Sequence, residues 1–503
     1  MAHSPNKLIP ESYDPAPSLQ RDPAVSAPSA LTGAATAVGY FVSTDGDVPA
    51  ELGLGRAALA AAGFTGAAGQ SLVLPREDAT AVIAVGAGSG AARTADELRD
   101  AAAAFARAAG RHAKLALVLP AGHGLQGAHA AQLSVEGALL ARYRFNALQT
   151  APKDIAVDSL EVVGAGEGAA AGAARGKVLV RSASLARDLA NNPPGHLTAT
   201  EYADFATEQG PEFGLTVETY DKAALIELGC GGLLGVNAGS HEEPRMIVLR
   251  YKPSSEPTAH LAFVGKGIMY DSGGISLKPS DPMHLAMKMD MAGSAAVLAA
   301  MTGLRDLGAT AEVSAWLMCT DNMPSGTATK LGDVLTARNG TTVEVKNTDA
   351  EGRLVMMDAL CLAMEETPDA IVDIATLTGA AMAALGTLVG ATIGNDQPLV
   401  DQVTAAAAAT GESAWQLPLE TRYRSQLNSD IADISNMGGP TAGAITAALF
   451  LSEFVKGTPW AHIDIAGTMK SDTDDSWRPR GATGYGTRLL SELIVNFTKG
   501  SQA

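Results

Sequence analysis

Residues 260–279 read HLAFVGKGIMYDSGGISLKP, a predicted strand followed by a glycine-rich loop. Residues 261–264 are all apolar, without alternation, as expected of a central strand that helices cover on both faces. The glycines allow tight backbone turns, so the loop can direct Lys266, Asp271 and Lys278 inward. Because sites in open α/β sheets form outside the carboxyl ends of the strands, this stretch predicts charged side chains at one edge of such a sheet.

Alternating strands and helices are predicted on both sides of this stretch. Apolar runs predict further strands at Ala37–Val42, Ala81–Val85, Leu115–Leu119, Arg245–Tyr251, Glu312–Met318, Ala370–Ala375 and Ala461–Ile465. Helical spacing predicts helices at Ala95–Ala109 with Thr94 as the cap, Ala128–Phe145, Leu185–Pro194 and Ser294–Leu307. The expected fold class is α/β, with two domains that each contain a mostly parallel sheet flanked by helices.

The domain organisation follows from length and local composition. At 503 residues the chain is too long for one ordinary core. Residues 1–31 are rich in Pro, Ser and Ala, which predicts a disordered N-terminal arm. We expect an N-terminal α/β domain over residues 32–175, ending in a linker that includes Gly164–Gly176, and a larger catalytic domain over residues 176–503.

Composition excludes several classes of protein. The formal net charge of -18 argues against a general binder of nucleic acid or anionic membranes, because neutralising phosphates requires clustered Lys and Arg. No stretch is apolar enough to span a bilayer, and no secretory signal is recognised, so we expect a cytoplasmic enzyme. The spacing of Cys230, Cys319 and Cys361 predicts buried free thiols.

A second charged stretch is NTDAEGRL at Asn347–Leu354. If it is extended, Asp349, Glu351 and Arg353 point to the same side, and a divalent metal beside an anion would balance them. The alternative is a solvated loop whose charges face water. The missing side chain at Gly352 suggests that another backbone packs closely behind the site.

Together the acidic residues suggest a hydrolytic site with two metal ions. Asp290 stands just before a predicted helix, where the alternative role is an ordinary helix cap. With Asp271, Asp349 and Glu351 it would bring four negative charges together, and two divalent cations would balance them. Lys278 and Arg353 have the chemistry to stabilise an oxyanion.

These motifs resemble the leucyl aminopeptidase family of dinuclear metallo-exopeptidases, also called cytosol aminopeptidases. Asn347–Leu354 matches the family signature without substitution. The resemblance covers Leu185–Phe497 and includes the segments Lys266–Pro279, Asn322–Gly326, Ala375–Ala380 and Trp460–Gly467.

The resemblance implies the role of each site residue. The metal ligands would be Lys266, Asp271, Asp290, Asp349 and Glu351, with Asp271 and Glu351 shared between both ions. Lys266 would bind as a neutral amine, which requires a strongly lowered pKa. Lys278 would hold the substrate carbonyl, Arg353 would position a bicarbonate ion as general base, and a metal-bridging water would be the nucleophile. The pocket for the first side chain would contain Thr376, Leu377, Gly379 and Met287.

The family pattern further implies peptide substrates with a free N-terminus, a leucine-like preference and a homohexamer. Its oxygen-rich ligands with one amine would suit Mn or Zn, and also Mg or Co. The sequence departs from the pattern at Met269-Tyr270, at Asp321 and by one extra residue within Pro279–His284. We interpret His284 as a loop or packing histidine. The alternative function is a DNA-binding or regulatory protein on the same scaffold.

Overall fold

The computed structural model describes residues 9–10, 13–90 and 93–500, which divide into two compact units. The smaller unit comprises residues 16–184 and 471–481, and the larger unit comprises residues 185–470, residues 482–500 and the described part of residues 1–15. Both units are α/β, so the predicted fold class is confirmed.

The smaller unit is built on a six-stranded sheet with the order β1-β6-β5-β2-β4-β3. All neighbouring strands are parallel except β3, which pairs antiparallel with β4. The strands are β1 (Ala24–Ser26), β2 (Ala37–Val42), β3 (Ser71–Pro75), β4 (Ala81–Gly86), β5 (Lys114–Val118) and β6 (Ser159–Val163). The helices are η1 (Pro17–Gln20), η2 (Ala50–Leu52), α1 (Arg56–Ala61), α2 (Ala95–Ala108), α3 (Gly127–Ala141) and α4 (Ala169–Asn191), which continues into the larger unit.

The core of the smaller unit lies between this sheet and the paired helices α2 and α3. Thr94 caps α2 as predicted, in a capping box with Glu97. Helix α3 ends at Ala141, earlier than predicted. A second, smaller core includes Leu59 of α1 and Phe64.

Two predictions for this unit were wrong in part. The stretch Gly164–Gly176 is largely the beginning of α4, because its glycines allow close packing against α3. A Cβ at Gly172 would lie 1.7 Å from the carbonyl oxygen of Ala128. The expected arm is ordered at Ala24–Ser26, which pairs in parallel with β6, whereas residues 1–8 and 11–12 lie outside the described part of the chain.

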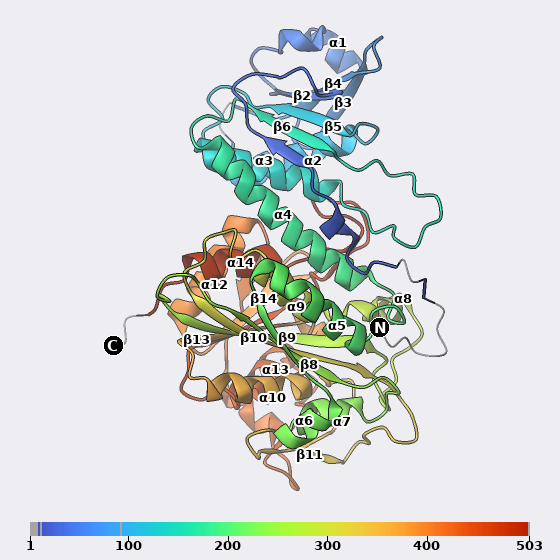
Figure 1. Ribbon diagram of the computed structural model, residues 1–503, viewed down its shortest axis with the longest axis vertical. Helices are drawn as coiled ribbons and strands as arrows, with labels where there is room; N and C mark the ends of the chain where they lie inside the picture. Colours follow the sequence, from blue (N-terminus) through green and yellow to red (C-terminus); the bar gives the residue numbers. More distant parts are fainter. Residues whose placement is uncertain (1–8, 11–12, 91–92, 501–503) are drawn as a thin grey trace. The chain divides into compact units, whose positions relative to one another are not determined.

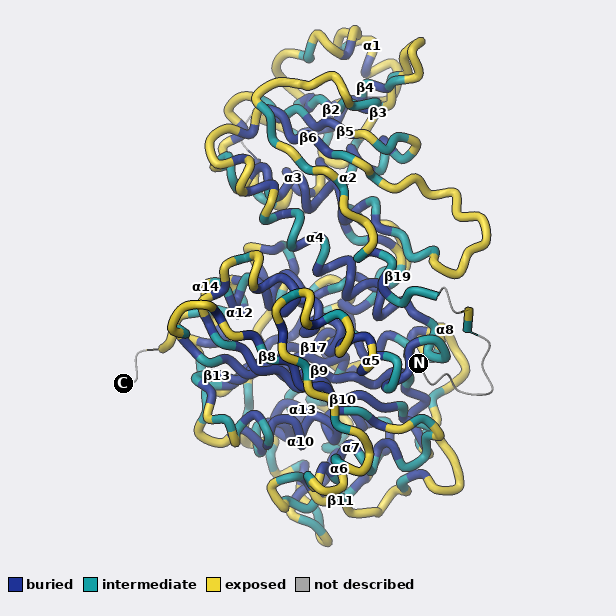
Figure 2. Tube along the Cα trace, in the orientation of Figure 1, coloured by how far each residue is buried: buried dark blue, intermediate teal, exposed yellow. Residues whose placement is uncertain are grey.

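The larger unit contains an eight-stranded sheet with the order β15-β14-β17-β13-β9-β10-β8-β7. The central strands β17, β13, β9 and β10 are parallel, and Figure 2 shows that this centre is buried. The strands are β7 (Thr216–Tyr220), β8 (Arg245–Tyr251), β9 (His260–Asp271), β10 (Glu312–Asn322), β13 (Ala370–Ala375), β14 (Gly390–Gly394), β15 (Ala414–Gln416) and β17 (Trp460–Asp464). Smaller sheets contain β11 (Val334–Thr336), β12 (Thr342–Glu344) and β16 (Ile434–Ser435), and β18 (Lys470–Ser471) and β19 (Gly481–Ala482).

Helices cover both faces of this sheet (Figure 1). Helices α5, α9, α12 and α14 lie on one face, and α7, α10 and α13 lie on the other. The helices of the unit are α5 (Ala199–Gln209), η3 (Gly210–Phe213), α6 (Lys222–Leu228), α7 (Gly231–Asn237), α8 (Pro282–Ala286), η4 (Met287–Met289), α9 (Ala292–Met301), α10 (Gly352–Glu365), α11 (Gly379–Leu385), α12 (Gln397–Thr410), η5 (Thr421–Leu427), α13 (Gly443–Ser452) and α14 (Thr487–Asn496). Among the described residues, no helix has the length and apolarity that a membrane crossing requires.

Cys230, Cys319 and Cys361 are buried free thiols, as predicted.

Candidate active site

Lys266 and Asp271 both belong to strand β9, which extends seven residues past the predicted end at Val264. Five positions separate them, so a regular strand would place them on opposite faces. However, Ile268 pairs with Thr320 and Tyr270 pairs with Asp321, which leaves Met269 as an extra residue in the ladder. This bulge restores the alternation, and both charged side chains reach the same site.

The turn after β9 fixes the orientation of Asp271. Gly273 and Gly274 have φ values of 89° and 65°, which other residues rarely adopt. The Oδ1 atom of Asp271 accepts hydrogen bonds from the Gly273 amide at 2.9 Å and from Nδ2 of Asn322 at 2.8 Å. The same Nδ2 donates to the Thr348 carbonyl at 2.9 Å, so Asn322 connects β9 to the second charged stretch.

That second stretch is not extended, and this prediction was wrong. Asp349 lies in a turn, and Glu351 is the N-cap residue of α10 with helical backbone angles. The helix begins at Gly352, because the run from Arg353 to Glu365 packs as a buried helix rather than as a strand. Asp349 and Glu351 therefore reach the site from a turn and a helix start instead of one strand face.

Asp290 meets Lys266 and Glu351 at the centre of the site. The Nζ atom of Lys266 lies 2.9 Å from Oδ2 of Asp290 and 2.7 Å from Oε1 of Glu351, and it donates to the Thr376 carbonyl at 2.7 Å. Oγ1 of Thr376 donates to Oδ1 of Asp290 at 2.6 Å. The alternative role of Asp290 as a helix cap is excluded, because α9 has Met291 at its N-cap and no side-chain cap.

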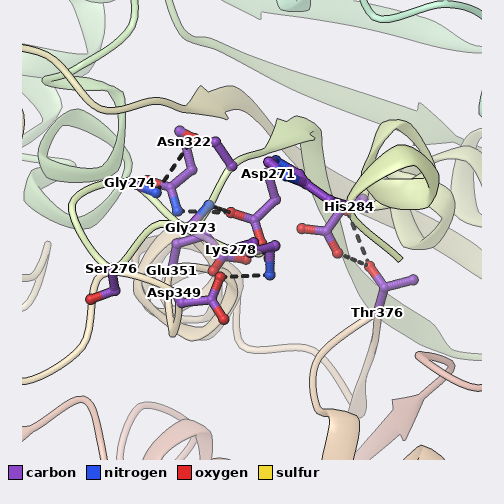
Figure 3. A network of polar contacts seen from close by, with 12 residues as sticks. Asp271, Gly273, Gly274, Ser276, Lys278, His284, Asn322, Asp349, Glu351 and Thr376 are labelled. Carbon is purple, nitrogen blue, oxygen red and sulfur yellow. Dashed lines mark hydrogen bonds and ion pairs between the residues drawn. The ribbon is translucent and has the colours of Figure 1, made fainter. Parts of the chain in front are cut away.

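Lys278 joins the other two carboxylates (Figure 3). Its Nζ atom lies 2.7 Å from Oδ2 of Asp271 and 2.5 Å from Oδ1 of Asp349. The side chains of Lys278 and Asp349 are 20% and 33% exposed, whereas that of Glu351 is 2% exposed. The cluster is therefore open to solvent on the side of Lys278 and Asp349.

Burial and neighbouring charges raise the pKa values of Asp271, Asp290 and Asp349. Burial, and next the charge of Glu351, raises the pKa of Asp271. Burial raises the pKa of Asp290 well above its usual value, against the opposing charge of Lys266. The pKa of Asp349 is also raised, by burial and then by Asp271. Buried carboxyl groups with raised pKa values favour a bound cation, because the cation would stabilise their ionised forms.

The donor set fits divalent metal ions. Asp271, Asp290 and Glu351 each offer an oxygen within 4.8 Å of the others. Oδ2 of Asp290 and Oδ1 of Asp349 are buried and make no hydrogen bond within the described part of the chain, although each contacts a lysine. Asp349 lies outside the group of three but shares Lys278 with Asp271. Carboxylate oxygens with one amine suit hard or borderline divalent ions.

The protein groups around Lys266 do not by themselves make it a neutral amine. Burial lowers its pKa, but the charges of Asp290 and Glu351 outweigh burial and raise the pKa overall. The expected lowering is therefore not produced by the protein. Only a dication in contact with the amine could reverse it, and binding that ion would release the proton.

Gly352 packs against a side chain, not against the backbone that the sequence suggested. A Cβ at this position would lie 2.7 Å from Cε and 2.8 Å from Cδ and Nζ of Lys266. The absence of a side chain at Gly352 therefore leaves space for the extended Lys266, which reaches Glu351 from β9.

Arg353 lies in the first turn of α10 and is 5% exposed. Its Nη1 donates to the Asn436 carbonyl at 2.8 Å, while its Nε has no hydrogen-bond partner among the described residues. Burial lowers the pKa of Arg353 to about 10, although Glu351 and Asp464 oppose this change. It is a buried cation with a donor that remains available to an anion.

The expected side-chain pocket lies beside the cluster at the start of α11. Thr376 contacts both Asp290 and Lys266, Leu377 is half-buried, and Gly379 is exposed with open space where a Cβ would stand. Met287 is buried at the start of η4, the short helix that precedes Asp290.

Asp464 holds this loop in place, a role that sequence reasoning missed. Its Oδ1 accepts from the amides of Leu377 at 3.2 Å and Thr378 at 3.3 Å, and its Oδ2 accepts from Oγ1 of Thr378 at 2.6 Å. Asp464 is 1% exposed at the end of β17, next to β13. The available signal was an acidic residue at the carboxyl end of a predicted central strand. Asn322 is likewise a polar residue at the end of its strand, β10.

Among the described residues, no hydrogen bond or ion pair joins His284 to the carboxylates of the site. Its ring stacks on Tyr270 with 5.8 Å between centroids, consistent with the interpretation as a packing histidine. It nevertheless lies near the cluster in Figure 3. Its Nε2 is buried and has no hydrogen-bond partner in the part of the chain that the structure describes.

Buried carboxylates and lysines at the carboxyl ends of parallel strands form the type of site that metal-dependent hydrolases use. The sequence matches the profiles described as the cytosol aminopeptidase family, catalytic domain, over residues 184–491, and the N-terminal domain of the same family over residues 48–152. The chain therefore belongs to the cytosol aminopeptidase family. It is a peptidase that removes N-terminal residues, as the sequence predicted.

Relatives and solved structures agree with this membership. A probable cytosol aminopeptidase of Solibacter usitatus is 44% identical over 426 residues, covering 84% of this chain and 88% of the relative. A probable cytosol aminopeptidase of Streptomyces avermitilis is 44% identical over 458 residues, covering 87% and 88%.

Two solved structures share the fold across both units. The bottromycin maturation enzyme BotP has a TM-score of 0.85 at 38% identity, covering 93% of this chain and 100% of that one. BotP is also known in complex with Mn. A mutant of tomato leucine aminopeptidase has a TM-score of 0.85 at 31% identity, covering 94% and 96%.

Proposed function

We propose that the protein is a dinuclear metal-dependent leucyl aminopeptidase. The observation that carries this proposal is the buried group of Asp271, Asp290 and Glu351, whose oxygens lie within 4.8 Å of one another and beside two lysines. The four carboxylates Asp271, Asp290, Asp349 and Glu351 together carry four negative charges, which two divalent ions would balance.

The ions would be held by Lys266, Asp271, Asp290, Asp349 and Glu351, with Asp271 and Glu351 shared. Mn or Zn would occupy the sites, with Mg or Co as substitutes. When bound, such ions act as Lewis acids and lower the pKa of water enough to make a nucleophile near neutral pH. Asn322 and Thr376 would keep Asp271 and Asp290 oriented through the hydrogen bonds described above.

Lys278 would hold the carbonyl oxygen of the scissile bond. It lies on the open side of the cluster, and the charges of Asp271 and Glu351 raise its pKa even though burial opposes them. A permanently protonated ammonium can stabilise the negative charge that develops on that oxygen in the transition state. Metal ions bound to Asp271 and Asp349 would free Lys278 from these carboxylates for that contact.

Arg353 would position a bicarbonate ion that accepts and returns a proton. Its Nη1 is fixed by the Asn436 carbonyl, which orients the guanidinium, and its buried Nε is a donor for an anion. With this anion in place, no side chain of the site needs to act as the general base.

The substrate would be a peptide with a free N-terminus, and the first peptide bond would be cleaved. An internal bond lacks the free amine, which we infer to be the group that the centre selects. The loop Thr376–Gly379, held by Asp464, would accept a leucine-like side chain, because Leu377 is half-buried and Gly379 leaves open space.

Two peptides of the same sequence test this proposal, one with a free and one with an acetylated N-terminus. We expect hydrolysis of the free peptide with release of its first residue, and no hydrolysis of the acetylated one. Product analysis by mass spectrometry identifies the bond cleaved. Cleavage of the acetylated peptide at a comparable rate, or release from an internal bond, would contradict the proposed selectivity.

The proposals of a homohexamer and a cytoplasmic location rest on family membership. Light scattering of the purified protein measures the first, and a mass near that of one or two chains would contradict it. Fractionation of the producing cells measures the second, and recovery of the enzyme outside the cytoplasm would contradict it.

A further inference from the structure

The smaller unit contains a cavity of about 370 Å³ that has no part in the peptidase site. Four segments line it: the chain around η1, the end of α3, the chain before β6 and the middle of α4. The volume lies in the range of pockets that bind small molecules, which is about 300–1,000 Å³. It is therefore large enough for an organic ligand rather than a single water.

Part of the wall is apolar. Leu139 and Val180 belong to the main core of the smaller unit, and Tyr143 beside them is 5% exposed. Val157 and Val178 continue this wall and are half-buried. An aromatic or branched aliphatic group would bury apolar surface here that now contacts solvent.

The polar part of the wall is mainly cationic, although the whole chain has a net charge of -18. Four basic residues and a single acid, Asp22, line the cavity: Arg21, Arg142, Lys177 and Arg181. Asp22 pairs with Lys177 at 2.6 Å and is 84% exposed. Among the side chains that line the cavity, basic groups outnumber acidic ones by four to one.

Arg142 contributes a cation that the fold holds in place. Its guanidinium donates to the carbonyl oxygens of Ala109 at 3.0 Å and His112 at 3.3 Å, and it also reaches Ile155. Carbonyl groups orient the charge but do not neutralise it. Burial, followed by the like charge of Arg144, lowers the pKa of Arg142, and the charge of Asp154 opposes this change.

Helix α4 presents one continuous stripe to this cavity. Ala174, Lys177, Val178, Arg181 and Ser184 follow each other at spacings of three or four residues, so they share one helix face. Lys177 and Arg181 stand one turn apart on this face, so both cationic side chains border the same side of the cavity.

We propose that this cavity binds a small organic anion: a carboxylate, sulfonate or phosphate that carries an aromatic or branched aliphatic body. The cationic stripe and Arg142 recognise the anionic group, and the wall of Leu139, Tyr143 and Val157 accepts the apolar body. The site lies within the smaller unit and is independent of the proposed metal centre.

A fluorescent anion tests the proposal on the full-length, metal-loaded enzyme. Anilinonaphthalene sulfonate carries the required charge and body, and N-phenylnaphthylamine has the same ring skeleton without the sulfonate. We expect saturable binding of the sulfonate and at least about tenfold weaker binding of the uncharged dye, the loss of one charge-assisted contact. Equal affinity for both dyes, or no saturable binding of the sulfonate, would overturn the proposal.

Substitutions locate the binding. Ala174→Trp places a large ring in the cavity and should abolish sulfonate binding, whereas Ala60→Trp, at an exposed alanine of α1 that does not line the cavity, should not change it. Lys177→Gln and Arg181→Gln should each weaken binding about tenfold, and Arg111→Gln, an exposed cation outside the cavity, should leave it unchanged. Should Ala174→Trp not fold, as judged by circular dichroism, the two charge variants decide. Binding that survives Ala174→Trp in a folded protein, or that survives both charge variants, rules out this cavity.

Discussion

The two units share an architecture and differ in what stands at the ends of their strands. In the larger unit, β9, β10 and β17 end in Asp271, Asn322 and Asp464, and the residue after β13 is Thr376. In the smaller unit, β4 ends in Gly86, and Gly164 follows the end of β6. A parallel sheet therefore determines where a site can form, whereas the residues at the carboxyl ends of its strands determine the chemistry of that site.

The largest difference between the two units should appear when a buried acid is replaced in each, because only the acid in the larger unit should be needed for metal binding and turnover. Glu351→Ala should remove bound metal and reduce turnover to background, because Glu351 contacts Lys266 and is within reach of both other buried carboxylates. Metal content by mass spectrometry and hydrolysis of a leucine chromogenic amide measure both effects. A variant that keeps metal and turnover would exclude Glu351 as a ligand.

Glu161 in the smaller unit provides the matched control. It is 7% exposed on β6 and accepts a hydrogen bond from the Thr32 amide at 3.2 Å. Glu161→Ala should lower the melting temperature and leave turnover per folded molecule unchanged. If both acids proved equally necessary for turnover, the contrast between the units would not hold.

Replacing Lys278 should reduce catalysis without releasing bound metal. Lys278→Met removes the cation on the open side of the cluster, and we expect kcat to fall about 100- to 1000-fold, the usual effect of deleting one oxyanion donor. Steady-state kinetics and metal analysis on one preparation measure this. Lys330→Met, at a lysine whose ammonium donates to the Ala328 carbonyl at 3.4 Å, is the control, and metal loss in Lys278→Met would assign Lys278 to metal binding instead.

A side chain at position 352 should weaken metal binding, because it would displace Lys266. The methyl group in Gly352→Ala would displace the Lys266 side chain, so we expect metal affinity to fall about 10- to 100-fold. Competition with a chelating dye measures the affinity. Gly326→Ala is the control, because nothing lies within 4 Å of its added Cβ. Equal affinities in the two variants would show that Lys266 does not need this space.

Asp464 should affect substrate binding more than metal. Asp464→Asn loses one of the acceptors that hold Leu377 and Thr378, and a buried hydrogen bond of this kind is worth about 1–3 kcal/mol. We expect kcat/KM to fall about tenfold, with a changed preference among N-terminal residues and unchanged metal content. Uniform loss over all substrates together with lost metal would point to general damage of the site.

Much of the fold follows from local sequence. The strands β8 and β13 coincide with their predicted bounds, and Thr94 caps α2, because apolar runs and capping residues act over a few positions. The start of α4 was missed because Gly172 and Gly176 weaken a helix locally but allow close contact with α3. Such compensation by a distant segment is invisible in one stretch of sequence.

The charged residues of the site were also predictable, but their geometry was not. Lys266 and Asp271 reach one side only because of the bulge at Met269, which depends on the pairing between β9 and β10. The signature Asn347–Leu354 combines a turn with a helix start, although its alternation suggested a strand. The positioning roles of Asn322 and Asp464 depend on strands that are neighbours in the sheet and distant in the chain.

Titration of the metal-stripped enzyme with Mn or Zn tests directly whether the site binds two ions per chain and needs both for turnover. Bound metal per chain and turnover of a leucine chromogenic amide are followed on the same samples. We expect no turnover without metal. As metal is added, turnover should rise and level off only when two ions are bound per chain. Full turnover in the complete absence of metal, or a plateau at one ion per chain, would contradict it.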